Sequence, residues 1–387
     1  MTFTRAFVFT LLVLLMLTAA FMAGYVFHMV RTGQDHNFSV LEEAYDILTQ
    51  NGVKDVPPAP AIEYGMIRGM VEAYDDPYTQ FVEPPQHELQ SNALQGSFGG
   101  IGVGLGNDQE GYVVLFPFPA GPASAAGIQE GDRLLFVGSL EIQLDTPVES
   151  IQSAIRGPVG DRVTLTLARP PDYTPFRVTV KRAEIALPSV TSHLAPGEPR
   201  LGVLEINLIA ASTSDEIQRA IRELQGRGAT HFVLDLRDNP GGLLNAGVDI
   251  ARLFLKDGVV IEQQYKGREV ETFHVDRSGP LTDVPLAVLI NGGSASAAEI
   301  IAGALKAHQR AILVGTASFG KDSIQLVFDL QDRSSLHITA ARWWVPGLEP
   351  PLGGTGVQPD VVVEPSEDQS GPDPLLQAAA RQLFRQP

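Results

Sequence analysis

The sequence predicts a multidomain protein of the α/β plus α+β class, and three observations carry this prediction. A long run of uncharged residues near the start indicates an N-terminal membrane anchor ahead of a helical region. A glycine-rich stretch in the first half leads into short alternating segments, which are typical of a β-rich module. From Arg200 onward, apolar runs alternate with helical patterns, which indicates a core with a mixed or mostly parallel sheet covered by helices.

Length and composition exclude several kinds of site. The 387 residues suffice for two or three domains of about 150 residues each. The formal charge of −17 argues against nucleic acid as the main partner, because a phosphate backbone requires a basic face. The absence of cysteine excludes disulfides, thiolate metal sites and a cysteine nucleophile. Any catalytic chemistry must therefore come from other side chains.

The first segment, residues 1–34, is predicted to anchor the chain in a membrane. Residues 6–30 carry no formal charge and lie between Arg5 and Arg31. This run exceeds the roughly 20 residues that span a hydrocarbon core, and also the about 7–15 residues usual in the core of a signal peptide. We therefore expect an uncleaved span with the body of the protein outside the cytoplasm. The alternative is a cleaved signal peptide, which would leave the body secreted.

Three further regions follow the anchor. Residues 35–96 show apolar positions at helical spacing on both sides of the breaking sequence VPPAPA, which predicts a helical N-terminal region. Residues 97–183 form the β-rich module, with one helix capped by Thr146 and beginning at Pro147. Residues 184–387 contain the core and a short amphipathic tail helix. The core strands are expected at 201–206, 232–236, 285–290 and 311–315, and its helices at 214–225, 244–254 and 297–306.

Irregular segments follow three of the predicted core strands. NPGG follows strand 232–236, NGGSAS follows strand 285–290, and TASFGK follows strand 311–315. In an open parallel sheet, ligands bind in the crevice at the carboxyl ends of the strands. If these three strands are neighbours, the crevice receives a serine, a lysine and glycine-rich backbone together.

Ser296 is the candidate nucleophile of this crevice, although a simpler interpretation exists. Ser296 and Glu299 have the spacing of a capping box, and residue types alone slightly favour a helix cap. A helix start is nevertheless a place where backbone N–H groups and the dipole favour an anion. An oxyanion hole would be built at the same place.

Lys321 is the candidate base, because none of the eight histidines stands in a recognisable catalytic context. A free lysine has a pKa of about 10.4 and a useful base about 7–8, a difference of roughly 4 kcal/mol that burial can supply. If the segment is extended, Gln325 lies on the same face as Lys321 and can orient its amine, while Asp322 points away. The alternative is a solvated surface lysine.

Eight motifs in order resemble one known family, the carboxyl-terminal processing peptidases or tail-specific proteases. These are serine endopeptidases with a Ser-Lys dyad and an embedded PDZ domain. The motifs that carry the resemblance are DDPYTQFV, FGGIGVGL, GDRLLFV, IRGPVGDRV, LDLRDNPGG, NGGSASAAEI, ASFGKDSIQ and GVQPDVVV. Together they run from about Val40 to the end of the chain, and eight in sequence form a specific signal.

The resemblance implies roles for individual residues of the core. It makes Ser296, rather than Ser294, the nucleophile and Lys321, 25 residues later, the base, with Gln325 orienting the lysine. The implied reaction is acyl transfer through an acyl-enzyme, with no cofactor and no metal. The oxyanion hole would use the amide of Ala297 and a glycine amide of NPGG, for which Gly242 is preferred to Gly241.

The resemblance also identifies residues 97–183 with a PDZ domain. Its carboxylate-binding loop would be formed by Gly100, Ile101, Gly102 and Val103. The adjacent strand edge would pair with a peptide, and an apolar pocket would take its last side chain. Expected partners are therefore proteins or peptides with free apolar C-termini, and the membrane through the anchor, but no nucleic acid. The oligomeric state is left open, a homo-oligomer included.

The leading expectation is a serine endopeptidase that recognises substrates by their C-termini. The first alternative is a catalytically inactive adaptor that binds C-terminal peptides through the PDZ domain, and the second is a hydrolase of small acyl substrates. The sequence departs from the family pattern in three places. Ala298 stands where the family often has a serine, Asp322 stands beside the lysine, and ARWWVPGLEPP is bulkier than the usual segment. These departures bear on rate and specificity more than on reaction type.

Overall fold

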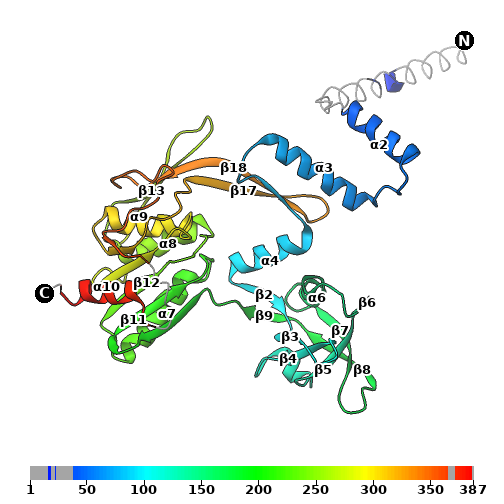
Figure 1. Ribbon diagram of the computed structural model, residues 1–387, viewed down its shortest axis with the longest axis horizontal. Coiled ribbons are helices and arrows are strands. Elements are labelled where there is room, and N and C mark those ends of the chain that lie inside the picture. The colour runs from blue at the N-terminus through cyan, green and yellow to red at the C-terminus, as the bar shows by residue number, and fades with distance from the viewer. Residues whose placement is uncertain (1–15, 19–21, 23–37, 365–370, 386–387) are drawn as a thin grey trace, which may run out of the picture. The chain divides into compact units, whose positions relative to one another are not determined.

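The computed structural model describes residues 16–18, 22, 38–364 and 371–385 (Figure 1). The predicted anchor, residues 6–30, lies almost entirely outside these residues. Among the helices that are described, none combines the length and the apolar character needed to cross a membrane.

The chain divides into two compact units, residues 1–66 and 67–387. In the first unit, α2 (Ser39–Asn51) is followed by the beginning of α3 (Ala59–Tyr74), so both helices predicted on either side of VPPAPA are present. Facing residues of the two helices line a hollow of about 470 Å³, which includes Leu41, Tyr45 and Ile62.

The β-rich module of the second unit is a twisted antiparallel sheet. Its strand order is β3 (Val103–Asn107), β4 (Val113–Pro117), β5 (Asp132–Val137), β7 (Arg162–Ala168) and β8 (Pro175–Lys181), with β6 (Leu140–Glu141) on β5. The short helix α5 (Pro122–Ala125) and the longer α6 (Val148–Ile155) complete it. Alternate side chains of the strands, such as Leu165 and Leu167, are fully buried with Ile151 of α6. The pairing of β2 (Ser97–Gly100) with β9 (Ala183–Ala186) joins the two ends of the module.

A six-stranded sheet forms the centre of the core. Its order is β10 (Val190–Ala195), β11 (Glu198–Ile206), β12 (His231–Asp235), β15 (Leu286–Ile290), β16 (Ile312–Gly315) and β19 (Val361–Val362). All neighbours from β11 to β19 are parallel, and only the edge strand β10 is antiparallel. The strands β12, β15 and β16 are therefore neighbours, so the loops that follow them leave the same edge of the sheet.

Helices cover both faces of this sheet, as the apolar strands require. Side chains at one set of alternating positions, such as Leu234 and Val288, are buried against α7 (Thr213–Gly226), α8 (Leu244–Phe254) and α9 (Ala297–Ala307). The other set, such as Val233 and Leu289, is buried against α10 (Pro374–Leu383), the red helix of Figure 1.

A second, antiparallel sheet of the core was predicted only in part. It contains β1 (Gln80–Val82), β18 (Ser335–Trp344), β13 (Val259–Tyr265) and β14 (Glu271–His274), with β17 (Ser323–Asp329) on the other side of β18. The alternating stretches 259–264 and 269–275 around Lys266-Gly267-Arg268 predict the hairpin of β13 and β14, whereas nothing in the sequence predicts the pairing of β1 with β18. Helix α4 (Pro84–Gln95) follows β1 and leads to the β-rich module. Trp343 of β18 and Ile324 of β17 pack into the cluster of α8 and α9, so this sheet is attached to the core by one of its faces.

Candidate active site

Ser296 lies at a strained turn between β15 and α9. Its backbone has φ 54° and ψ −116°, a region that residues other than glycine rarely adopt. In α/β-hydrolases, a sharp strand-to-helix turn presents a serine hydroxyl at the top of a sheet in this way. The neighbouring Ser294 differs, because it is fully buried and its hydroxyl donates a hydrogen bond to the carbonyl of Leu236 at 2.7 Å. Of the two serines, only Ser296 is partly accessible.

Asn239 holds the NPGG loop against the serine loop. It is fully buried, its amide nitrogen donates to the carbonyl of Ile206 at 2.5 Å, and its side-chain oxygen accepts the Gly241 N–H at 2.8 Å. Its backbone carbonyl accepts the N–H of Ala295 at 2.9 Å. The NPGG motif was recognised in the sequence, but no role was predicted for Asn239, because nothing in the sequence shows that this polar side chain is buried.

Gly241 makes the close approach of the two loops feasible. A Cβ atom at Gly241 would lie 2.9 Å from the Cβ of Ser296 and 3.0 Å from the nitrogen of Ala297, so no larger residue fits. Its φ of 99° also favours glycine. The Gly241 N–H already donates a hydrogen bond to the Asn239 side chain within the same loop, so it is not free to donate to a substrate.

The amides of Gly242 and Ala297 differ from that of Gly241. Gly242 pairs with Ile209 in a parallel bridge whose two hydrogen bonds use the Gly241 carbonyl and the Leu243 N–H. In such a bridge the N–H of the central residue points away from its partner. Ala297 is the first residue of α9, where backbone N–H groups have no intrahelical acceptor. Both predicted oxyanion donors therefore belong to the two loops that meet at Ser296.

Lys321 and Gln325 form a direct contact. The Lys321 Nζ donates a hydrogen bond to the Gln325 Oε1 at 2.8 Å, and the Gln325 Nε2 donates to the carbonyl of Tyr78. The Lys321 Nζ also lies 4.8 Å from the centroid of the Tyr78 ring, within the range of a cation–π contact. Tyr78 belongs to the DDPYTQFV motif, to which the sequence assigned no role.

Burial lowers the pKa of Lys321 below its usual value, and the charges of Asp76 and Glu299 partly oppose this change. For Asp76 itself, burial raises the pKa, but hydrogen bonds led by the one from Thr79 outweigh it, and the pKa is lowered. Asp76 therefore favours its ionised form beside the lysine. The sequence singled out Asp322 as the carboxylate to consider, whereas Asp76 and Glu299 are the acids that act on the amine.

Glu299 connects the two candidate catalytic residues. Its side chain is fully buried, and its Oε2 accepts the backbone N–H of Ser296 at 2.8 Å and that of Lys321 at 2.9 Å. Its Oε1 accepts the Ser318 hydroxyl at 2.5 Å and the Gly320 N–H at 2.6 Å. Burial raises the pKa of this carboxyl, and the four donors oppose the rise. From the sequence, Glu299 was interpreted only as part of a capping box. Its contacts with the lysine loop were not predicted.

A separate small hollow lies in the β-rich module. It has a volume of about 110 Å³ and lies between the turn from β2 to β3 and helix α6. Ile101 is buried at 1% exposure, and Gly102 has a φ of 69°. Gly100 ends β2 and Val103 begins β3, so the four predicted loop residues form this turn. The guanidinium of Arg156, at the end of α6, lies 4.1 Å from the ring centroid of Phe98 in the wall of the hollow.

No group of three or more histidine or acidic side chains in the described residues is arranged to hold a metal ion. The groups that this site offers are the Ser296 hydroxyl, the Lys321 amine of lowered pKa, and backbone N–H groups near the hydroxyl.

Two family models match the chain. The model of peptidase family S41 matches residues 200–363, which contain the NPGG, NGGSAS and FGK loops. The model of the PDZ domain matches residues 119–169, within the β-rich module.

Individual relatives extend the similarity beyond these ranges. A carboxyl-terminal-processing protease of Picosynechococcus is 37% identical over 304 residues, which cover 78% of this chain and 72% of the relative. A protein of the same name from Synechocystis is 33% identical over 305 residues, covering 78% and 71%. Among solved structures, a photosystem II D1 C-terminal processing protease is 29% identical, covers 85% of this chain and 89% of that chain, and has a TM-score of 0.45.

Replacing Glu299 by glutamine is expected to lower the free energy of unfolding by about 1–3 kcal/mol, because the amide nitrogen of glutamine would face N–H donors in a buried site. Urea unfolding followed by fluorescence measures the change. Glu223→Gln on the exposed face of α7 is the matched control and should stay within about 0.5 kcal/mol of the wild type. Equal unfolding midpoints for the two variants would contradict the role given to Glu299.

Proposed function

Since the chain belongs to peptidase family S41 and is a carboxyl-terminal-processing serine protease, we propose that Ser296 and Lys321 form its catalytic dyad. The observation that carries the proposal is the shared carboxylate. One oxygen of the buried Glu299 accepts the backbone N–H groups of both residues, which brings the two loops together. Gln325 then orients the amine without placing a further negative charge on it.

In the proposed reaction, the Ser296 hydroxyl attacks the scissile carbonyl while the neutral amine of Lys321 takes its proton. The resulting oxyanion accepts hydrogen bonds from the Gly242 and Ala297 N–H groups. Lys321 then passes the proton to the leaving amine, and water releases the acyl-enzyme. We assign the glycine donor to Gly242 rather than Gly241, since the Gly241 N–H already binds Asn239.

Substrates are proposed to bind through a free apolar C-terminus in the module of residues 97–183. The turn of Gly100, Ile101, Gly102 and Val103 would offer backbone N–H groups to the terminal carboxylate. The hollow of about 110 Å³ beside it is lined by apolar side chains, among them Ile101 and Ile155, which suits a small apolar last residue.

The N-terminal segment is proposed to hold the protease on a membrane, with its body outside the cytoplasm. The proposal rests on the sequence of residues 6–30, which carries no formal charge over 25 positions. One of the related proteases, from Arabidopsis thaliana, is named chloroplastic, which is a location outside the cytosol for that protein.

Removal of either dyad residue is expected to lower kcat by about 10³-fold or more. Ser296→Ala lacks the nucleophile, and Lys321→Arg keeps a charge but has no neutral form that accepts a proton. Lys256→Ala, at an exposed position, is the matched control and should cleave like the wild type. Cleavage of an unfolded protein with an apolar C-terminus, followed by mass spectrometry, gives the measurement. Full activity of Ser296→Ala would refute the dyad.

The same Ser296→Ala variant separates the protease from the inactive adaptor that the sequence left as an alternative. It should still bind a fluorescent peptide with an apolar C-terminus, and amidation of that terminus should weaken binding at least about tenfold because a charge-assisted contact is lost. Fluorescence anisotropy measures both affinities. Binding by the wild type without any turnover would favour the adaptor.

The pH dependence of kcat/KM is expected to report Lys321. Activity should rise with pH through the pKa of this lysine, because only the neutral amine accepts the serine proton. Asp76→Asn removes a negative charge that raises this pKa, so the rise should move to lower pH. The neighbouring Asp75→Asn serves as control, since Asp75 is not among the charges that shift the pKa of Lys321. A rise at higher pH in Asp76→Asn would contradict the assignment of Lys321 as the base.

Deletion of residues 1–35 is expected to release the protease from membranes. The full chain should sediment with membranes and resist extraction by high salt, while the shortened chain should remain in the supernatant. Mass spectrometry of the full chain shows whether its first residues are retained. An intact full chain in the soluble fraction would contradict anchoring.

A further inference from the structure

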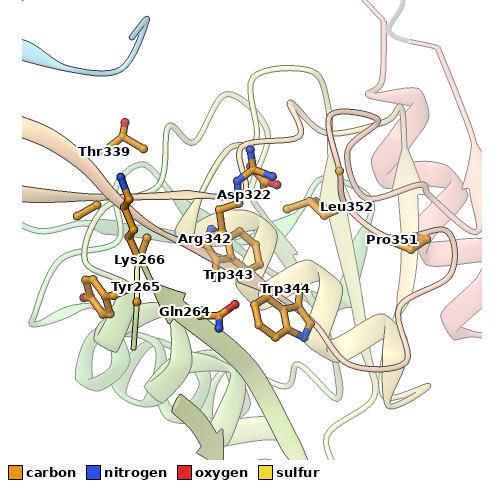
Figure 2. Close-up of a pocket in the computed structure, with 14 residues that line it drawn as sticks. Gln264, Tyr265, Lys266, Asp322, Thr339, Arg342, Trp343, Trp344, Pro351 and Leu352 are labelled. Carbon is orange, nitrogen blue, oxygen red and sulfur yellow. The ribbon is translucent and has the colours of Figure 1, made fainter. Parts of the chain in front are cut away.

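A groove of about 680 Å³ lies on the antiparallel sheet of the core (Figure 2). Its walls come from the end of β13 and the hairpin after it, from the second half of β18, and from the loop at residues 351–353. Asp322, the residue next to Lys321, also lines it. The segment ARWWVPGLEPP, which the sequence marked as unusually bulky, supplies much of this wall.

Thr339 and Arg342, two of the residues that line the groove, lie on the same face of the sheet as Gln325. Ile324 and Trp343 point to the α8 and α9 side, so Gln325, its neighbour on β17, points to the opposite face. Thr339 pairs with Gln325 and lines the groove, and Arg342 lines it as well. A bulge between Ile324 and Gln325 adds one residue on β18, which lets Thr339 and Arg342 share a face.

This placement points to a segment of the substrate as the occupant of the groove. Gln325 binds the amine of Lys321, so the face that carries Thr339 and Arg342 also carries the group that orients the proposed base. Asp322 lines the groove and adjoins Lys321 in the chain. The groove therefore begins one residue from the proposed base, and a polypeptide bound at the dyad is the occupant that this position favours.

The charges in the groove are mainly positive although the chain is acidic overall. Lys266 and Arg342 are both exposed and line it, and neither forms an ion pair within the described part of the chain. In Figure 2 the Lys266 amine points toward Thr339. The nearby Glu262 is engaged by the indole N–H of Trp344 at 2.8 Å. The two cations and the apolar side chains of Trp344 and Leu352 line the same groove, so together they offer an acidic side chain both charge complementarity and an apolar wall.

We propose that this groove is a specificity site that binds an acidic side chain of the substrate near the scissile bond, through Lys266 and Arg342. The proposal rests on the function proposed above, because it needs Ser296 and Lys321 to mark the scissile bond. The negative charge of Asp322 disfavours an acidic substrate side chain next to it, beside Lys321. The acidic residue therefore lies at a short distance along the substrate from the cleaved bond.

The test is a scan of peptide substrates with the full chain in detergent. A cleaved peptide receives a single Glu, or Gln as the neutral match, at each of four positions on either side of the bond. At one of these positions the wild type should cleave the Glu peptide roughly three- to tenfold faster in kcat/KM, the range of one or two exposed charge pairs. This preference should shrink as salt is raised.

Charge reversal provides the decisive variants. Lys266→Glu combined with Arg342→Glu should lose the preference and favour Lys over Gln at the same position. The matched control is Arg268→Glu on the same hairpin, which lies outside the groove and should keep the preference for Glu. Equal cleavage of Glu and Gln peptides at all positions, or a preference that survives the reversal, would overturn the proposal.

The failure of the dyad and the failure of the groove give different results. If Ser296→Ala cleaves like the wild type, the dyad is wrong whatever the charge preference. If Ser296→Ala is inactive and the wild type cleaves Glu and Gln peptides equally, only the proposal of the groove as a specificity site is refuted. Binding of amidated peptides to Ser296→Ala provides a readout without turnover, and it should show the same preference for Glu and the same loss in the reversed variant.

Discussion

The buried carboxylate of Glu299 is the interaction on which the rest of the site depends. An ionised carboxylate is costly to bury unless hydrogen bonds replace its water. Here three backbone N–H groups donate to it, one from the serine loop and two from the lysine loop, and the Ser318 hydroxyl is a fourth donor. Its place in the first turn of α9 is one that the helix dipole favours for an anion. The distance between the serine and lysine loops is therefore fixed by one side chain.

This arrangement has an electrostatic consequence for the base. The charge of Glu299, like that of Asp76, raises the pKa of Lys321 and opposes the effect of burial. A third acid in direct contact with the amine would stabilise the ammonium further and weaken the base. Gln325 avoids this effect, because its amide oxygen orients the amine as a neutral acceptor. Gln325 thus orients the Lys321 amine by direct contact, whereas the more remote Asp76 and Glu299 act on its pKa through their charges.

The sequence predicted the parts of this site that depend on local pattern. The apolar runs of β12, β15 and β16 indicated buried parallel strands, and their adjacency brings Ser296 and the NPGG loop together. The sequence could not predict contacts that depend on burial or on distant pairing. Asn239 and Glu299 are polar residues whose burial no local pattern reveals. Tyr78 meets Gln325 across 247 positions of the chain, a pairing that periodicity cannot report.

The antiparallel sheet carries both Gln325, which contacts the proposed base, and the groove proposed to select the substrate. Without the bulge beside Gln325, strict alternation along β18 would place Thr339 and Arg342 on opposite faces, because they are three residues apart. With the bulge, Thr339, which pairs with Gln325, and Arg342, which lines the groove, face the same side of the sheet. The inner face of the same sheet is fixed by Trp343, which is 2% exposed. One face is therefore packed into the core, while the other face carries Gln325, which contacts Lys321, and the cation Arg342 of the proposed substrate groove.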